Sequence, residues 1–423
     1  MLQVLGSAWA LLFGMFLLML GNGMQGTLLG IRGEIEGFDT FLMSLVMSAY
    51  FVGFLGGSRL APGLIKRVGH VRVFAALASL ISAVMILYPT FPYVWVWVLG
   101  RVLIGFCFSA VYVTAESWLN NAADNTNRGQ ALSLYMIIQT LGIVAAQAML
   151  LVAEPDGFIL FVIPSVLVSI AVTPILLSIS PTPAFDTTKP MSLKKLMGFS
   201  PLGCVGMFIL GGIFSAQFGM SSVYGAEAGL SVAQISTFVA TFFIGAVFLQ
   251  YPIGWISDRM DRRFLVIIVS IIGGVGCTIG ALFGDVFSLL LLSAFVIGGM
   301  ANPLYSLLIA HTNDFLTRDD MAAASGGLLF INGLGAILGP VITGWIMGTN
   351  LGPAGFYWFT GVLFLAMVLY SGYRATRRSG VAVEDTASYV PMGPTATSVA
   401  LGIAREYAIE TKLEVAEPEK PAA

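Results

Sequence analysis

The dominant pattern in this sequence is a series of long apolar runs separated by short polar segments. A helix that crosses a lipid bilayer needs about 20 mostly apolar residues in succession. Because every backbone polar group must be satisfied internally in lipid, such runs are expected to be helical. The pattern predicts twelve membrane-spanning helices, over residues 8–31, 41–64, 72–90, 93–118, 130–152, 157–178, 201–224, 232–255, 264–283, 286–311, 321–347 and 354–374.

The composition agrees with this pattern. Of 423 residues, 57% are hydrophobic and only 10% are charged, whereas an average soluble domain is about 25% charged. A soluble fold of this length has too little interior to hide so much apolar surface. We therefore predict an all-α polytopic membrane protein whose outer surface contacts the lipid bilayer.

The charged loops predict the orientation of the chain. Lys and Arg concentrate in alternate loops, at 66–72, 128, 189–195, 259–263, 318 and 374–378. The opposite loops hold Arg32 alone among several acidic residues. Because cytoplasmic loops carry the excess of Lys and Arg, both termini are expected in the cytoplasm. The expected location is a bacterial inner membrane.

The two halves of the chain resemble each other. At an offset of 192 residues Gly53 aligns with Gly245, and at 193 Gly105 aligns with Gly298. A constant offset of this kind indicates an internal repeat, which is common in secondary transporters. We expect a six-helix bundle over 1–178, a cytoplasmic loop over 179–200 and a second six-helix bundle over 201–374. The polar cytoplasmic tail over 375–423 is expected to be disordered or only loosely docked.

The loop GWISDRMDRR at 254–263 resembles the G-x-L-a-D-r-x-G-r-r motif of the major facilitator superfamily. The first-half loop PGLIKRVGH departs from the motif at Pro62 and Lys66. The resemblance implies twelve helices in two pseudo-symmetric bundles and a charged latch between them at the cytoplasmic side. In that latch Asp258 would face Arg128, and Lys66 and Arg67 would face Asp319 and Asp320, with Arg259 and Arg262 completing the motif. The alternative is that these charges are simply solvated.

Two charges stand inside the fourth predicted helix, in RVLIGFCFSAVYVTAE. At 100° per residue Arg101, Tyr112 and Glu116 fall on one helical face. Ionisable residues within a membrane helix usually face the bundle interior or a wet cavity. Because the two charges are about 22 Å apart along the axis, they cannot pair directly. Arg101 is expected to bind an anionic group or hold a proton-linked network, and Glu116 to titrate or to brace the helix.

Polar side chains at depth in other predicted helices extend this candidate site. Amides and hydroxyls recognise a polar solute without a fixed charge, although they also hold helices together at ~0.6–2 kcal/mol each. The candidate residues are Asn22, Gln25, Gln139, Gln217, Asn302, Tyr305 and Asn332.

Several function classes are disfavoured. The net charge of −2 offers no basic face for nucleic acid, and there is no G-x-x-x-x-G-K-[ST] loop for an ATP-driven pump. The three cysteines lie inside apolar runs and imply neither a disulfide framework nor a metal site. No nucleophile–base pair has a recognisable spacing, so neither an enzyme nor a cofactor is expected.

Within the superfamily, ESWLN, PGLIKRVGH and NPLYSLLIAHTND resemble the YcaD-like bacterial branch. The resemblance implies a monomeric carrier that moves a small-molecule substrate by alternating access. We expect proton-linked transport of a small polar or anionic organic solute. The alternatives are efflux of an amphipathic compound and a non-transporting membrane sensor or assembly factor that uses the tail.

Overall fold

All twelve apolar runs form helices in the computed structural model. The structure describes residues 2–122, 128–177, 191–378, 380–381, 386, 389–393, 395–397 and 399–402. Within these residues it is helical and has no strand. The elements are α1 Leu2–Ile35, α2 Thr40–Val68, α3 His70–Thr90, α4 Val94–Ala122, α5 Arg128–Met149, α6 Ile159–Leu177, α7 Leu193–Phe199, α8 Pro201–Ser215, η1 Ala216–Met220, α9 Ser221–Glu227, α10 Val232–Ser257, α11 Arg262–Phe283, α12 Phe287–Asn313, α13 Arg318–Met347, η2 Gly352–Ala354 and α14 Gly355–Arg377.

The predicted spans are confirmed in number and differ by only a few residues at their ends. Twelve helical segments of the described chain are long and apolar enough to cross a membrane. The seventh combines α8, η1 and α9, because a π-helical turn at Ala216–Met220 interrupts an otherwise continuous helix. This turn was not predicted, since nothing in the apolar pattern distinguishes it.

Local signals explain where several helices begin and end. The Asp39 side chain accepts hydrogen bonds from backbone N–H groups at the start of α2. Ser231 and Gln234 form a capping box at the start of α10. Gly69 joins α2 to α3 with a φ of 85°, a left-handed conformation that favours glycine.

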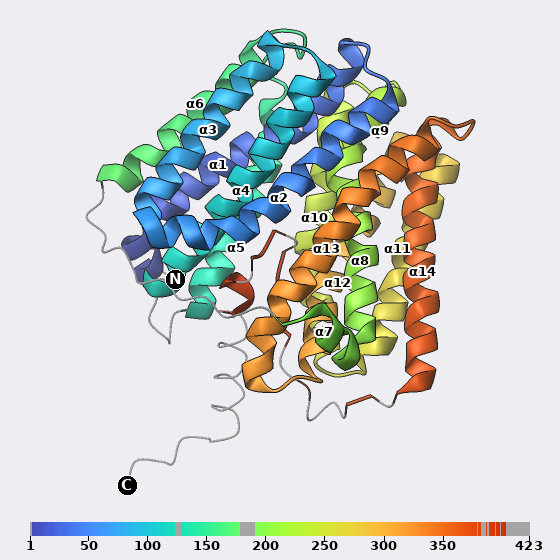
Figure 1. Ribbon diagram of the computed structural model, residues 1–423. Helices are drawn as coiled ribbons and strands as arrows, with labels where there is room; N and C mark the ends of the chain where they lie inside the picture. Colours follow the sequence, from blue (N-terminus) through green and yellow to red (C-terminus); the bar gives the residue numbers. More distant parts are fainter. Residues whose placement is uncertain are drawn as a thin grey trace.

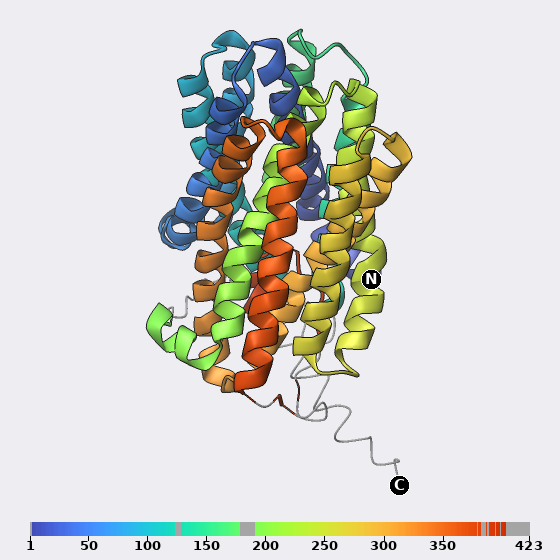
Figure 2. The same cartoon turned by 90° about the vertical axis from the view of Figure 1, so that its right-hand side faces the viewer.

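The helices form two bundles that lie side by side (Figure 1). In the first bundle α2 packs along α4, and α1 packs on α5 and α6. In the second, α10 packs along α12, α8 packs on α13, and α11 packs on α14. Figure 2 shows the helices of the second bundle running from one end of the molecule to the other. Large apolar side chains such as Leu99 and Phe248 are exposed on the outside, as expected of surfaces that contact lipid.

The two ends of the molecule differ in charge. We call the end with Lys66, Arg67, Arg259, Arg374 and Arg377 the basic end, which lies at the bottom of Figure 1 with α7. The opposite end is called the acidic end, and it carries Glu34, Glu36, Asp39, Glu154 and Asp156.

The bundles contact each other closely in their acidic half. α1 packs against α9, and α2 packs against α13. The Ser48 hydroxyl donates a 2.6 Å hydrogen bond to the Ile337 carbonyl, which joins α2 to α13. Toward the basic end part of the polar tail lies between the bundles instead (Figure 1).

The expectation of a disordered tail is therefore corrected for its described residues. Met392, Ala396, Thr397, Ala400 and Leu401 are buried. The sequence did not reveal this because these residues bind helices that lie as far as 86 and 281 positions away along the chain.

Candidate functional site

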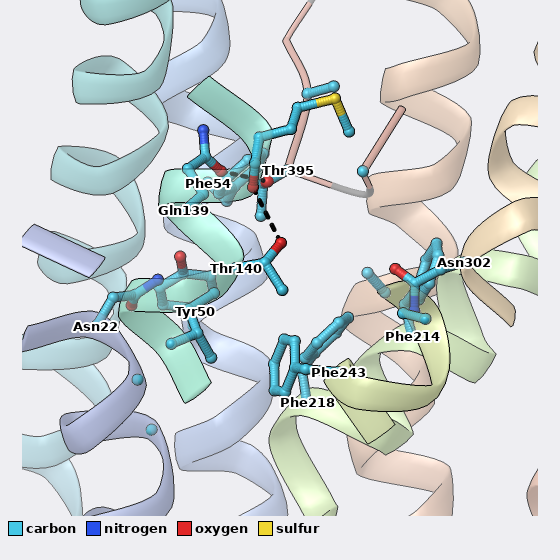
Figure 3. Close-up of a pocket in the computed structure, with 18 of the residues that line it drawn as sticks. Asn22, Tyr50, Phe54, Gln139, Thr140, Phe214, Phe218, Phe243, Asn302 and Thr395 are labelled. Carbon is cyan, nitrogen blue, oxygen red and sulfur yellow. Dashed lines mark hydrogen bonds between the residues drawn. The ribbon is translucent and has the colours of Figure 1, made fainter. Parts of the chain in front are cut away.

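A central cavity lies between the bundles and holds about 1560 Å³ of atom-free space, part of it open to solvent. The wall comes from α1, α2, α4 and α5 of the first bundle and α8, η1, α10, α12 and α13 of the second, together with part of the tail. Figure 3 shows this cavity with side chains from both bundles.

Arg101 is the cation of this cavity. It is 3% exposed. Its Nη1 donates a 2.9 Å hydrogen bond to Gln25 Oε1, and its guanidinium carbon lies 4.7 Å from the centre of the Tyr50 ring. Its Nε has no hydrogen-bond partner in the described part of the chain. Its Nη2 lies 3.6 Å from the Met47 sulfur, so the guanidinium has neutral neighbours and one donor nitrogen without a partner in the described chain.

A line of polar contacts runs from Arg101 toward the centre of the first bundle. Gln25 Nε2 donates to Asn22 Oδ1 over 3.2 Å, and Asn22 Nδ2 donates to the Tyr112 hydroxyl over 3.1 Å. The line fixes the orientation of both amides beside the cavity. It joins Arg101 and Tyr112, which the sequence placed on one face of α4, to two residues of α1.

Glu116 lies at the basic side of the cavity and is 1% exposed. Its carboxylate accepts hydrogen bonds from the backbone N–H groups of Thr397 and Ala400, at 3.2 and 3.3 Å. The Thr397 hydroxyl donates to the same oxygen. Tyr135 donates to the other oxygen over 3.5 Å. Among the described residues that line the cavity, Glu116 is the carboxyl group and Arg101 the guanidinium.

The remaining predicted amides have different surroundings. Gln139 lines the cavity and accepts a 3.2 Å hydrogen bond from the Thr395 hydroxyl of the tail. Asn302 lines it from α12 and donates to the Gly298 carbonyl of its own helix. Asn332 lines it from α13 and donates to the Met207 carbonyl of α8, which also holds the two helices together.

Besides Tyr112, two more predicted residues lie off the cavity wall. Gln217 is buried in η1, and neither of its amide atoms has a hydrogen-bond partner in the described part of the chain. Tyr305 is buried behind Phe214, with 6.1 Å between the ring centres. Both stay candidates only for an indirect role, since neither reaches the atom-free space.

The second bundle contributes an aromatic wall that the sequence did not single out. Phe214, Phe218 and Phe243 line the cavity opposite Asn22 and Tyr50 (Figure 3). The ring centres of Phe218 and Phe243 are 5.2 Å apart. In a membrane protein phenylalanines are too common for composition alone to mark these three, and only the fold shows which ones face the interior.

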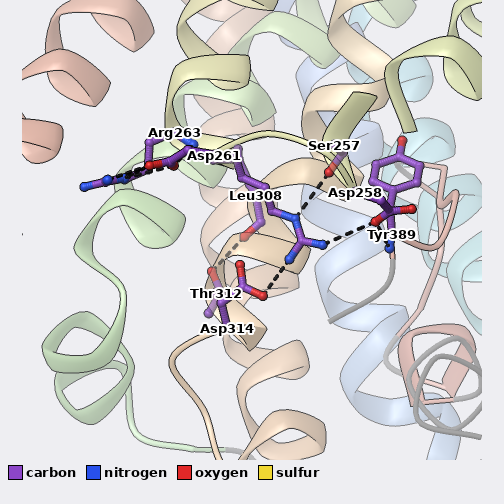
Figure 4. A network of polar contacts seen from close by, with 9 residues as sticks. Ser257, Asp258, Asp261, Arg263, Leu308, Thr312, Asp314 and Tyr389 are labelled. Atoms are coloured by element: carbon purple, nitrogen blue, oxygen red, sulfur yellow. Dashed lines mark hydrogen bonds and ion pairs between the residues drawn. The ribbon is translucent and has the colours of Figure 1, made fainter. Parts of the chain in front are cut away.

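A second polar cluster lies at the basic end, where the latch was predicted (Figure 4). Arg262 forms a 2.6 Å ion pair with Asp314 and donates to the Ser257 hydroxyl over 3.2 Å. Asp258 lies 3.6 Å from Arg262 and accepts a 2.8 Å hydrogen bond from the Tyr389 backbone N–H. This cluster joins α10, α11, α12 and the tail.

One predicted latch pairing, that of Asp320, is corrected. Asp320 binds Lys195, at 2.8 Å, instead of Lys66 or Arg67. The hydrogen bond from the Lys195 ammonium lowers the pKa of the Asp320 carboxyl. The reason for the difference is α7, which places Lys195 beside the start of α13.

Other members of the predicted latch act locally or lie outside the description. The side chains of Arg128 and Asp319 are outside the described residues. The guanidinium of Arg259 stacks on the Trp255 ring of its own bundle, with 4.1 Å between its central carbon and the ring centre.

Comparison with known proteins identifies the fold family. The sequence profile of the Major Facilitator Superfamily matches residues 11–224 and 202–404. An uncharacterized MFS-type transporter, YcaD of Escherichia fergusonii, is 28% identical over 345 residues, which cover 80% of this chain and 88% of that protein.

Two solved structures show the same fold. The nucleoside transporter NupG aligns with a TM-score of 0.68 at 16% identity, covering 86% of this chain and 98% of NupG. A D-xylose-proton symporter aligns with a TM-score of 0.64 at 14% identity, covering 86% and 96%. With twelve spanning helices in two bundles around a central cavity, the chain belongs to the major facilitator superfamily of secondary transporters and, within it, to the YcaD-like branch.

Proposed function

We propose that this transporter carries a small organic anion by alternating access, linked to proton movement, across a bacterial inner membrane. The expected class was a small polar or anionic solute, and the surroundings of Arg101 favour the anion. The basic end would face the cytoplasm, as the distribution of Lys and Arg predicts.

The buried guanidinium of Arg101 is the observation that carries this proposal. Burying an unpaired charge is costly, so buried charges are normally paired with an opposite charge. In the described chain Arg101 has the Gln25 amide, the Met47 sulfur and the Tyr50 ring as neighbours, and no carboxylate is among its partners there. A carboxylate or a similar group on the substrate would supply the missing charge and bind the guanidinium with two parallel hydrogen bonds.

The opposite wall suits the body of such a molecule. Phe214, Phe218 and Phe243 offer apolar ring faces to a bound solute. The Asn302 and Asn332 amides, which lie near these rings, supply hydrogen bonds to hydroxyl or carbonyl groups. A site with a cation on one bundle and an aromatic wall on the other binds both bundles at once, as alternating access about a central site requires.

Glu116 is the candidate for proton exchange. It is the carboxyl group of the cavity wall, and it lies on the same helix as Arg101, about 22 Å farther along the axis. At this distance the two groups serve different steps. Arg101 binds the anion, and Glu116 takes up or releases a proton near the basic end.

The test uses purified protein in liposomes that contain a pH-sensitive dye. A panel of organic acids, amino acids, sugars and lipophilic cations is added to wild type and to Arg101→Gln. We expect addition of an organic acid to move protons in wild type. The affinity of Arg101→Gln for this acid should be at least about 30-fold lower, because one partner of a buried charge pair is lost. Arg101→Lys keeps the charge but not the fork of donors, so an intermediate loss is expected.

Arg72→Gln provides the matched control. Arg72 is an exposed cation at the start of α3, outside the cavity wall. The Arg72→Gln variant should transport at the wild-type rate. If a neutral sugar is the substrate and its transport survives Arg101→Gln, the anion assignment is wrong.

Efflux of an amphipathic compound is the second candidate function, and the three phenylalanines favour it. The same panel of compounds distinguishes anion transport from efflux of an amphipathic compound. Flux of a lipophilic cation that persists in Arg101→Gln would support efflux of such compounds.

A further inference from the structure

Part of the C-terminal tail binds inside the basic side of the cavity. We call this part the plug, and it consists of residues 389–393, 395–397 and 399–402. Met392, Gly393, Thr395, Ala396 and Ala400 line the cavity itself. The plug is therefore a wall of the candidate substrate site, although it follows the last membrane helix.

The plug is bound to the second bundle at its beginning. The Tyr389 backbone N–H donates to Asp258 over 2.8 Å, and the Gln250 amide donates to the Tyr389 hydroxyl over 3.1 Å. Ser306 of α12 exchanges two hydrogen bonds with the Met392 backbone: it accepts from the N–H at 2.8 Å and donates to the carbonyl at 3.2 Å. This pairing is the one that a β-strand edge offers an extended peptide.

The plug is bound to the first bundle at its end. The Thr395 hydroxyl donates to Gln139 of α5. Thr397 and Ala400 together direct two backbone N–H groups and one hydroxyl at Glu116 of α4. The described residues of the plug thus bind both bundles.

The sequence of this segment is compatible with a segment that enters and leaves a cavity of low polarity. Residues 389–402, YVPMGPTATSVALG, contain no Asp, Glu, Lys or Arg, whereas Asp385 and Arg405 stand on either side. Two prolines lack an N–H group, so fewer backbone donors need partners when the segment is buried. Most of its side chains are small. In the described part of the chain the ionic partners of the plug come from the bundles, at Asp258 and Glu116.

We propose that the basic mouth of the cavity is a peptide-binding site for the chain's own plug, which closes the cavity toward that end and must leave before substrate or water passes. Glu116 lines the cavity and also binds the plug, so a change at Glu116 would affect release of the plug. The consequence for transport rests on the function proposed above, whereas the binding of the plug does not.

The first test measures access to the cavity in the full chain. Thr140 lines the cavity, and among the described residues its hydroxyl donates to the Met136 carbonyl of its own helix. Thr140→Cys is introduced after the three native cysteines, all buried, are replaced. Labelling by a membrane-impermeant maleimide is then timed in inverted vesicles, which expose the basic end. Thr397→Val removes the hydroxyl that binds Glu116 and should speed labelling about tenfold, as expected for one hydrogen bond to a charged group.

A control variant and a shortened chain complete this test. Thr376→Val makes the same change at an exposed threonine that bonds only its own helix, and it should leave the labelling rate unchanged. A chain ending at residue 388 should be labelled fastest of all. Equal rates in wild type, Thr397→Val and the shortened chain would overturn the proposal.

The second test needs neither labelling nor transport. A fluorescent peptide of residues 389–402 is added to the shortened chain in lipid nanodiscs, and its anisotropy is recorded. We expect saturable binding that is about tenfold weaker for the Thr397→Val peptide and absent for a scrambled peptide. Binding no better than that of the scrambled peptide would overturn the proposal. If the peptide binds while no solute of the panel is transported by any variant, the plug stands and the proposed function fails.

Discussion

Two buried guanidinium groups in this chain have opposite surroundings. Arg262 has a carboxylate partner in Asp314, and both side chains are almost fully buried. Arg101 is equally buried but has an amide and an aromatic ring. Because burial is the same and pairing differs, the two residues have different tasks. Arg262 holds helices together, whereas Arg101 is the residue that we propose binds a ligand.

This difference predicts how the two sites respond to substitution. Removing one partner of a buried pair leaves the other charge uncompensated, which costs ~3–5 kcal/mol. Asp314→Asn should therefore lower the unfolding temperature of the purified protein clearly. Asp285→Asn, at an exposed position of the acidic end, should change stability by no more than ~0.5 kcal/mol. Equal unfolding temperatures for both variants would show that the Arg262–Asp314 pair does not stabilise the fold.

The sequence predicted single residues better than it predicted their partners. Helical periodicity placed Arg101, Tyr112 and Glu116 on one face of α4, and Arg101 and Glu116 do line the cavity. Their partners Gln25 and Thr397 are 76 and 281 positions away, and no local pattern reports such distances. For the same reason the expected partner of Asp320 was wrong, because the position of α7 was unknown.

At the scale of helices, the repeat between the two halves has a direct structural counterpart. A Cβ added to Gly53 would lie 1.8 Å from the Val102 carbonyl oxygen, and one added to Gly245 would lie 2.1 Å from the Phe295 oxygen. Gly105 and Gly298 occupy the partner positions of the same crossings, where α2 meets α4 and α10 meets α12. The aligned glycines are conserved between the halves because both crossings bring backbones into contact.

Substitution of these glycines should therefore destabilise both bundles alike. At Gly105 and Gly298 an added methyl group would overlap backbone atoms at 1.9 and 2.1 Å, so the crossing helices must move apart. Gly105→Ala and Gly298→Ala should each cost ~1–3 kcal/mol, read as a lower unfolding temperature. Gly63→Ala in α2 has no atom within 4 Å and should be neutral or slightly stabilising, since alanine favours helix. A Gly298→Ala variant as stable as Gly63→Ala would disprove the equivalence of the two crossings.

Helix positions were predictable to within a few residues because the apolar pattern depends only on local sequence. The π-helical turn at Ala216–Met220 was not, because it preserves the apolar run while shifting the register of the side chains after it. Gln217, a candidate site residue, lies inside this turn and is buried away from the cavity wall, whereas Phe214 and Phe218 line it.

At the scale of the whole molecule, the bundles are closed at the acidic end and separated by the plug at the basic end. Closure at the acidic end depends on small residues. A Cβ on Gly30 of α1 would lie 2.2 Å from the Ser222 hydroxyl of α9, and one on Gly344 of α13 would lie 2.3 Å from the Ser44 Cβ of α2. A carrier that alternates between two openings must be able to break these contacts, and a larger side chain there should favour the state in which they are broken.

Gly344→Val tests this balance. Its branched side chain cannot fit against Ser44, and overpacking of ~1–3 kcal/mol corresponds to a shift of about 5- to 150-fold in the population open at the acidic end. In intact cells, which would expose the acidic end, the cavity cysteine of Thr140→Cys should be labelled faster in this variant than in the parent. Gly348→Val, one turn farther along, meets only backbone of its own helix at 3.5 Å and should match the parent. Labelling that rises equally from both ends would indicate a loosened fold, whereas a rise confined to the acidic end requires two alternative openings of one cavity.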